Sequence, residues 1–425
     1  GWDSNAGLQP CEAKGWRRAV IQQLPESNDL NRKWWVLASL WLLYASFGLV
    51  AGSLAPLLNI IRVDLGMSHA TMGAALGAWP FVYLGVSAIT GKFLDRYGIQ
   101  IGLSLGALLI GVSGILRAGA QSGLGLWMAV AVFGLGGPFI SIGAPKLVTE
   151  WFPVAQRGLA VGLYSTASSL GAITALVVAD PIRVATGSWR WVMVLFGAVS
   201  FGSGLLWVVV SARSPSAQHL APTPVKSLSL LREPTISRIL LLAFMIFFIS
   251  HALGGWMPEM LASQMWSSRG AAWLTAAGVA VGVIGSLVIP SRTAPANRPQ
   301  VLIGLFVAMA IAVWALALSS QVAQVFAVSV VGIARVSTVP MAMLLLMSSQ
   351  AVPDERMGIA AGLFFTAGEI GGVSGPWVIG IARQNADNFG LSIGILSTVA
   401  IAAAIACWVF NKFGYLRHER PGEFR

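Results

Sequence analysis

The sequence predicts an all-α polytopic membrane protein with twelve transmembrane helices in two pseudo-symmetric six-helix bundles. Of its 425 residues, 56% are hydrophobic and only 10% are charged, whereas a soluble domain carries about a quarter charged residues. The apolar runs reach about 20 residues, which is the length of a membrane-spanning helix and exceeds that of a barrel strand. A pattern of small residues also occurs in both halves of the chain.

Six spans are expected in each half, and a polar stretch divides them. Residues 1–33 are polar and lack the apolar core of a signal peptide, so we expect a cytoplasmic N-terminal segment. Residues 212–235 combine several prolines with Arg and Lys, which indicates a cytoplasmic linker between the bundles 34–211 and 236–411. Residues 412–425 form a polar cytoplasmic tail. In order, the expected spans are 34–58, 70–93, 99–119, 124–148, 157–179, 189–211, 236–260, 271–290, 299–319, 322–347, 357–382 and 389–411.

The small residues fit this class of protein. The chain has 48 glycines, and small residues let helix backbones approach closely in lipid. The two cysteines, Cys11 and Cys407, show neither metal-binding nor redox spacing, so no disulfide framework is expected. We therefore predict no metal site and no cofactor.

The net charge of +11 orients the protein and does not indicate a nucleic-acid partner. The expected topology leaves few Lys and Arg on one side, and Arg335 alone lies inside the membrane. Under the positive-inside rule the richer side is cytoplasmic, and it holds both termini. We expect a multi-pass protein of the cell inner (plasma) membrane that is monomeric. The poor side holds Arg62, Arg117, Arg183, Arg190, Arg269 and Arg383.

The two halves are internal repeats. Several residues around the fifth span recur 200 residues later, around the eleventh, which indicates two related bundles. Such bundles are the architecture of alternating-access transporters with a site near the midplane. The recurring residues are Pro153, Gly158, Ala160, Gly162, Leu163, Thr166, Ala167 and Gly171, which match Pro353, Gly358, Ala360, Gly362, Leu363, Thr366, Ala367 and Gly371.

A charged turn follows the second span and reads Gly91-Lys92-Phe93-Leu94-Asp95-Arg96-Tyr97-Gly98. The pattern G-x-x-x-D-R-x-G resembles the signature between the second and third helices of the major facilitator superfamily. The resemblance implies that Gly91, Asp95, Arg96 and Gly98 form a conformational motif, in which Asp95 docks on the neighbouring bundle. The corresponding turn after the eighth span lacks an acidic residue.

Other resemblances are weaker. The run from His251 to Leu261 is similar to helix 7 of the cyanate and nitroimidazole permease branch. The chain also weakly resembles the organic-anion transporter branches. The fourth span lacks the mid-depth Arg that the superfamily links with proton handling. The Gly-Pro motif of antiporters is absent from the fifth span and occurs instead at Gly375-Pro376. Both departures argue against a typical multidrug/proton antiporter.

Two ionisable residues are expected deep in the membrane. Arg335 lies about 13 residues into its span, or ~20 Å along the helix, and Glu369 reaches a similar depth from the other side. Buried ionisable groups in a membrane are costly, so each is a functional candidate. In one interpretation Arg335 binds an anionic substrate and Glu369 carries a proton. In the other, the two residues neutralise each other between adjacent helices.

His251 and Tyr44 complete the set of candidates. His251 titrates near neutrality, so it could take part in substrate binding or proton coupling, although a plain interhelical hydrogen bond is equally consistent. Tyr44 lies on the first span, which usually lines the cavity in this superfamily. Lys146 and Arg117 lie near span ends and are expected to extend toward the interface.

These residues predict a secondary active transporter that moves a small solute, an organic anion in the leading hypothesis, by alternating access, with proton coupling as a further hypothesis. A guanidinium stays charged and offers paired donors to a carboxylate. The chain contains no phosphate-binding loop of the G-x-x-x-x-G-K-[ST] form, and no enzyme is predicted. The alternatives are an exporter of hydrophobic compounds, a Cu(I) importer, and a non-transporting sensor or assembly factor. The soft ligands for Cu(I) would be His251, Met257, Met260, Met341, Met343 and Met347.

Overall fold

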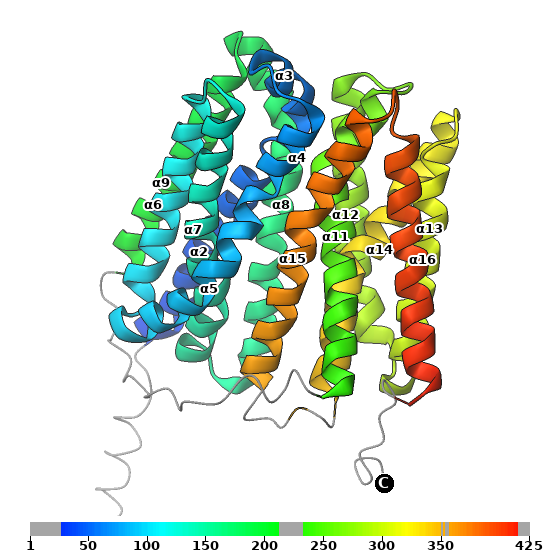
Figure 1. Cartoon of the computed structure of the whole chain (residues 1–425). Coiled ribbons are helices and arrows are strands. Elements are labelled where there is room, and N and C mark those ends of the chain that lie inside the picture. Colours follow the sequence, from blue (N-terminus) through cyan, green and yellow to red (C-terminus); the bar gives the residue numbers. More distant parts are fainter. Residues whose placement is uncertain (1–26, 212–232, 350–351, 353–356, 415–425) are drawn as a thin grey trace, which may run out of the picture.

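The computed structural model describes residues 27–211, 233–349, 352 and 357–414, nearly all of them in helices. The helices form two groups that stand side by side, one from each half of the chain (Figure 1). Most of the N-terminal segment, the linker and the tail expected from the sequence lie outside the described residues. The all-helical, two-bundle fold class predicted from the sequence is confirmed.

The N-terminal bundle contains six spans, two of which are interrupted. The first span is made of α2, the short η1 and α3, and the second is made of α4 and α5. Their bounds are Ser27–Gly52 (α2), Ala55–Leu57 (η1), Leu58–Asp64 (α3), His69–Leu76 (α4), Ala78–Tyr97 (α5), Ile99–Ala118 (α6), Gly123–Trp151 (α7), Val154–Thr186 (α8) and Trp189–Ser211 (α9).

The C-terminal bundle also has six spans, and its first two, α11 and α12, are unbroken helices. Its elements are Pro234–Ala262 (α11), Ser268–Arg292 (α12), Pro295–Asn297 (η2), Arg298–Ala315 (α13), Gln321–Met347 (α14), Met357–Gln384 (α15) and Gly390–Lys412 (α16). Ten described helices are long and apolar enough to cross a membrane, and the bent segment His69–Tyr97 brings the number to 11. The remaining long helix, α15, has 28 residues and packs along α11. With α15 included, the long helices and broken helices in the described ranges number twelve, as the sequence predicted.

Two span boundaries differ from the sequence prediction. The first span continues through Pro56 to Asp64, instead of ending near residue 58. The fifth continues through Pro181 to Thr186, although a polar turn was expected from Asp180 onward. Arg183 pairs with Asp180 one turn earlier, and Gly187 ends the helix in the left-handed region at φ 74°. Polar residues can therefore extend a helix beyond the apolar run when they bind each other.

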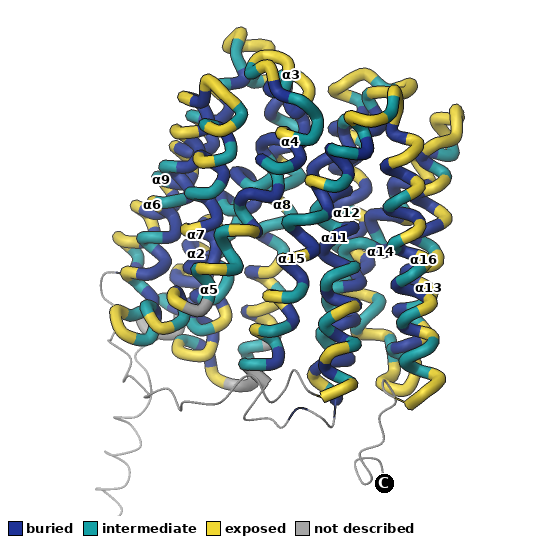
Figure 2. Tube along the Cα trace, viewed as in Figure 1, coloured by how far each residue is buried: buried dark blue, intermediate teal, exposed yellow. Residues whose placement is uncertain are grey.

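The helices end at two opposite ends of the molecule, called here the α3 end and the linker end. The α3 end, at the top of Figure 1, holds α3 and the turns after α6, α8, α11, α13 and α15. The linker end holds the last residues of α9 and α16 and the first residues of α2 and α11. Large apolar side chains such as Leu205, Val209, Ile311 and Phe326 are exposed. Exposed positions recur along the helices of both bundles (Figure 2). Exposed apolar side chains of this kind are compatible with lipid, so the chain is a multi-pass membrane protein.

Equivalent glycines form a close helix–helix seam in each bundle. In the first bundle α2 packs on α8, and a Cβ at Gly171 would overlap the carbonyl oxygen of Ala45. In the second, α11 packs on α15, and a Cβ at Gly371 would overlap the carbonyl oxygen of Phe244. Gly171 and Gly371 are one of the repeat pairs found in the sequence. The repeat therefore preserves a packing contact.

Candidate functional site

The bundles touch closely at the α3 end, where α4 lies against α15. A Cβ at Gly73 would overlap the carbonyl oxygen of Pro376, and a Cβ at Gly380 would overlap that of His69. The backbone nitrogen of Ala70 also donates to Gln384 Oε1 at 3.3 Å. Two helices from different bundles therefore approach backbone to backbone, and this seam closes the α3 end.

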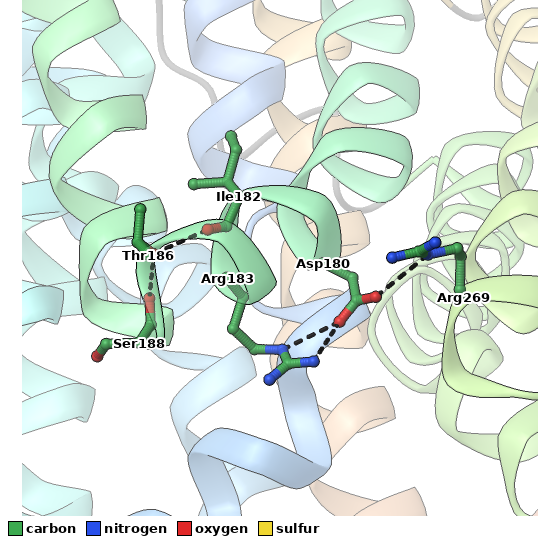
Figure 3. A network of polar contacts seen from close by, with 6 residues as sticks. All are labelled: Asp180, Ile182, Arg183, Thr186, Ser188 and Arg269. Atoms are coloured by element: carbon green, nitrogen blue, oxygen red, sulfur yellow. Dashed lines mark hydrogen bonds and ion pairs between the residues drawn. The ribbon is translucent and has the colours of Figure 1, made fainter.

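An ion-pair network joins the bundles at the same end (Figure 3). Arg183 donates from Nε and Nη2 to Asp180 Oδ1, at 3.0 and 2.8 Å. From the other bundle, Arg269 Nε on α12 donates to Asp180 Oδ2 at 3.4 Å. Asp180 is 9% exposed, and its two carboxylate oxygens bind one cation from each bundle. This network could not be predicted from the sequence, because nothing in the sequence places α8 beside α12.

The most deeply buried acid, Glu369, lies next to His251. Glu369 Oε2 on α15 is 3.6 Å from His251 Nε2 on α11, and Glu369 is 5% exposed. His251 Nδ1 lies 3.1 Å from the carbonyl oxygen of Phe247. A Cβ at Gly372 would lie 3.2 Å from the imidazole ring, so that glycine leaves room for His251.

This geometry sets the number of protons that the pair holds. The carbonyl of Phe247 can only accept, so His251 Nδ1 must carry the proton of that hydrogen bond. In a neutral ring Nε2 then presents a lone pair to Glu369, whose Oε2 is buried and lacks a hydrogen-bond partner among the described residues. A bare carboxylate facing a lone pair in this environment is unfavourable. The pair therefore favours one additional proton, held by His251 or by Glu369.

Arg335 does not pair with Glu369. Its Nη1 donates to the carbonyl oxygen of Ser250 at 3.2 Å, and no ion pair joins it to Glu369 within the described ranges. A Cβ at Gly254 would lie 3.5 Å from Arg335 Nη1, so the guanidinium lies over a part of α11 without a side chain. Of the two interpretations, mutual neutralisation between Arg335 and Glu369 is not observed. The half-buried guanidinium has a neutral partner and keeps donors available.

Aromatic residues of the N-terminal bundle face these groups. The Trp79 ring on α5 lies 5.1 Å from the His251 ring, across the boundary between the bundles. Trp79 also packs against Tyr83 and Phe133, and the Tyr83 hydroxyl is 2.8 Å from Ser141 Oγ. Arg335, His251, Glu369, Trp79 and Tyr83 are hereafter the central cluster. Its charged members belong to the C-terminal bundle and its aromatic members to the N-terminal bundle.

Tyr44 lies in an aromatic group on α2. Its ring is 5.6 Å from Phe47 and 5.7 Å from Tyr164, and it is half-buried. Phe47 in turn contacts Trp79 at 6.5 Å. Tyr44 is thus connected to the central cluster through Phe47, and no described hydrogen bond links it to Arg335 or His251.

The signature turn lies at the linker end. Gly98 has φ 86°, a backbone conformation that only glycine adopts easily, and it separates α5 from α6. Asp95 accepts a hydrogen bond from Lys146 Nζ on α7, in its own bundle. Arg96 lies over the Tyr97 ring, and Gly91 has open space around it. In this conformation Asp95 contacts Lys146, whereas the family resemblance had implied a contact with the neighbouring bundle.

One of two cations departs from expectation. Arg117 was expected to extend to the interface, yet it is 1% exposed and donates from Nη1 to the carbonyl oxygen of Val50 and to Ser53 Oγ. Lys146 was also expected to extend toward the interface, and it lies partly exposed at the linker end, where it binds Asp95. Local acceptors retain Arg117 inside the bundle, which hydropathy alone does not predict.

Three of the methionines considered as soft metal ligands are packed among apolar side chains. Met257, Met260 and Met341 belong to the hydrophobic core of the helices. Among the described residues, no group of three or more His, Cys, Asp or Glu side chains is placed to hold a metal ion. These methionines therefore have a packing role in this structure.

Comparison with known families defines the class of the protein. The sequence profile of the Major Facilitator Superfamily matches residues 40–376, so the chain belongs to that superfamily. The fold agrees with it. A bacterial homologue of the human lysosomal transporter Spinster superposes with a TM-score of 0.66 at 17% identity, covering 91% of this chain and 96% of that one.

Particular relatives are organic-acid transporters by name. The probable sulfoacetate transporter of Cupriavidus necator is 33% identical over 157 residues, which cover 37% of this chain and 36% of the relative. The hexuronate transporter of Escherichia coli K12 is 26% identical over 44% of this chain and 43% of the relative. The galacturonate transporter of Dickeya chrysanthemi is 25% identical over 38% and 46%. The matched segments thus span less than half the length of these relatives.

Proposed function

We propose that this protein is a secondary active transporter that moves a small organic anion across the membrane by alternating access, with proton coupling at His251 and Glu369. The observation that carries the proposal is Arg335, whose guanidinium lies at mid-depth and has a backbone carbonyl as its described hydrogen-bond acceptor. A buried cation in a membrane protein marks a substrate or ion pathway. The names of the relatives, which include sulfoacetate, hexuronate and galacturonate transporters, support the same substrate class.

In this proposal the residues of the central cluster have separate roles in substrate binding and proton transfer. Arg335 binds the carboxylate or sulfonate group of the substrate through its paired donors. Trp79 and Tyr83 offer apolar faces to the rest of the molecule, and the Tyr83 hydroxyl adds a polar edge. His251 and Glu369 exchange the proton that their geometry favours, so that a change in their charge accompanies anion binding.

The same proposal includes an orientation. The α3 end carries the few cations of the poor side, among them Arg62, Arg190 and Arg269, so it faces away from the cytoplasm. Both termini are then cytoplasmic, in the inner (plasma) membrane. The structure corresponds in this view to a state that is closed to the outside, because α4 meets α15 at that end.

The test is ligand stabilisation of the purified full chain. A ligand that binds the native state raises its unfolding temperature. We expect galacturonate or sulfoacetate to do so, and Arg335→Gln to weaken the apparent affinity by about 10- to 100-fold, since a charge-assisted hydrogen bond contributes roughly 1.5–3 kcal/mol. Arg335→Lys should restore part of the affinity.

The matched control is Arg157→Gln, because Arg157 lies at the linker end and binds the Phe152 and Thr149 carbonyls. The ligand panel also contains a cyanate salt, hydrophobic drugs and Cu(I). Stabilisation by neutral drugs or Cu(I) alone would contradict the proposal, as would an apparent affinity for anions that is the same in Arg335→Gln and Arg157→Gln.

A further inference from the structure

A pocket opens at the α3 end, and none of its lining residues belongs to the central cluster. It has a volume of about 340 Å³ and lies between the two bundles, with lining residues from α3, α4, α11 and α15. Its polar lining residues include Asn59, Arg62, His69, Glu259, Ser263 and Arg383. This volume is at the lower end of the range for small-molecule sites, so the pocket suits a compact ligand.

The two guanidiniums of the pocket have neutral partners in the described part of the chain. Arg62 donates from Nη2 to Asn59 Oδ1 at 2.8 Å and from Nη1 to the carbonyl oxygen of Met67 at 3.3 Å. Arg383 donates from Nη1 to the carbonyl oxygen of Ala386 at 2.7 Å. The Nε atoms of both residues are buried without a hydrogen-bond partner. Each guanidinium therefore has donor capacity left over, and no described carboxylate forms an ion pair with it within 4.0 Å.

Glu259 completes the arrangement. It is half-buried and lines the pocket, and no described ion pair joins it to Arg62 or Arg383 within 4.0 Å. A carboxylate and two guanidiniums thus border one small pocket without closing on each other. This spacing fits an occupant with two kinds of group, an oxyanion for the guanidiniums and a hydrogen-bond donor for Glu259.

We infer that this α3-end pocket is a second binding site, which takes a small carboxylate that also carries hydroxyl groups. Arg62 and Arg383 hold the carboxylate, while Glu259 and Asn59 accept from the hydroxyls. The site stands on residues separate from the central cluster. The pocket borders the α4–α15 seam at the α3 end, because His69 of α4 and Arg383 of α15 belong to its lining. Only the choice of probe rests on the proposed function.

The test is isothermal titration of the purified full chain with galacturonate, with acetate as the probe that lacks hydroxyls. In the Arg335→Gln background the pocket can be measured alone. We expect one binding event to remain there, and Arg62→Gln or Arg383→Gln to weaken it at least tenfold. Glu259→Gln should weaken galacturonate and leave acetate binding equal or stronger, because the variant removes a neighbouring negative charge.

Three controls separate the outcomes. Arg190→Gln removes a cation at the same end that pairs with Asp64 outside the pocket, and it should leave the remaining event unchanged. Arg62→Lys keeps the charge and should recover part of the affinity, which distinguishes lost binding from misfolding. Variants are compared only when their unfolding temperatures agree in the absence of ligand.

The inference is overturned if Arg335→Gln abolishes all binding that the native chain shows, a result that leaves the proposed function standing. It is also overturned if the remaining event does not respond to Arg62→Gln or Arg383→Gln. A native chain that binds no probe at all contradicts both the inference and the proposed function.

Discussion

At the scale of single residues, His251 and Glu369 form a close pair that is separate from Arg335. Their 3.6 Å separation, together with the bond from His251 Nδ1 to Phe247, favours one shared proton. A residue pair that gains or loses a proton inside the membrane changes the local charge by one unit. Such a change alters the cost of placing an anion beside Arg335.

We predict that Glu369→Gln separates binding from coupling. The amide keeps the shape of the side chain but cannot exchange a proton, so accumulation of galacturonate driven by a proton gradient should be lost. Exchange between labelled and unlabelled substrate, which needs no net proton movement, should continue at a rate within a fewfold of the native chain. Proteoliposomes with and without an imposed gradient measure both quantities.

The control for this change is Glu233→Gln, because Glu233 lies at the exposed start of α11. His251→Gln should give the same separation as Glu369→Gln. If Glu369→Gln retains gradient-driven accumulation, the pair is structural and proton coupling lies elsewhere.

The sequence identified these residues but not their partners. Depth in the membrane follows from counting residues along a span, so Arg335, His251 and Glu369 could be selected directly. Which of them meet depends on how α11, α14 and α15 rotate about their axes, and small residues such as Gly254 and Gly372 decide that. For this reason the pairing of Arg335 with Glu369 was a reasonable but wrong alternative, and the pairing with His251 was not predicted.

At the scale of the helices, the repeat glycines divide into two kinds. A Cβ at Gly171 or Gly371 would overlap a backbone oxygen of the facing helix, whereas nothing lies within 4 Å of a Cβ at Gly162 or Gly362. All four positions recur at the same spacing, so the sequence alone does not distinguish a packing glycine from an unconstrained one.

This difference gives a matched experiment on stability. Gly171→Ala and Gly371→Ala should each lower the free energy of unfolding by about 1–3 kcal/mol, because overpacking forces the helices apart. Gly162→Ala and Gly362→Ala should leave the stability unchanged or raise it by up to about 1 kcal/mol, since Ala favours a helix over Gly. Thermal unfolding of the four purified variants provides the comparison. Equal effects at all four positions would show that the seams are not tight.

The helix ends were the least predictable part of the fold. Apolar runs predicted the existence of each span, and the polar residues Asp64 and Asp180 were assigned to turns. In the structure both remain helical because they have cationic partners, Arg190 for Asp64 and Arg183 for Asp180. The hydropathy of the sequence shows how many residues of a helix lie in the apolar layer of the membrane. It does not show which polar residues continue the helix by forming hydrogen bonds outside that layer.

At the scale of the whole molecule, the Asp180 network connects the bundles and so bears on which end is closed. Removing its charge with Asp180→Asn should weaken the α3-end seal and raise the population that is open there. A cysteine at Leu76, which contacts Gly255 across the boundary, should then react faster with a thiol reagent. An ion pair of this kind contributes about 0.2–1 kcal/mol, so we expect a rise of roughly 1.4- to 5-fold.

The reporter requires a background in which Cys11 and Cys407 are replaced. The matched control is Asp64→Asn, since Asp64 and Arg190 form an ion pair at the same end but within one bundle. That variant should leave the reaction rate of the Leu76→Cys reporter unchanged. A similar acceleration in both variants would mean that Asp180 acts on local helix stability and not on the contact between the bundles.

The division of the central cluster between the bundles has a consequence for movement. Arg335, His251 and Glu369 belong to the C-terminal half, and Trp79 and Tyr83 belong to the N-terminal half, although Phe247 of the C-terminal half also stacks on the His251 ring. An anion held by Arg335 would therefore travel with the C-terminal half while the N-terminal half slides past it. No ion pair to the substrate would have to break during the swing, since flat aromatic faces resist sliding far less than a charged hydrogen bond does. Divergence among such proteins could then change the size of the cargo through one half and its charge through the other.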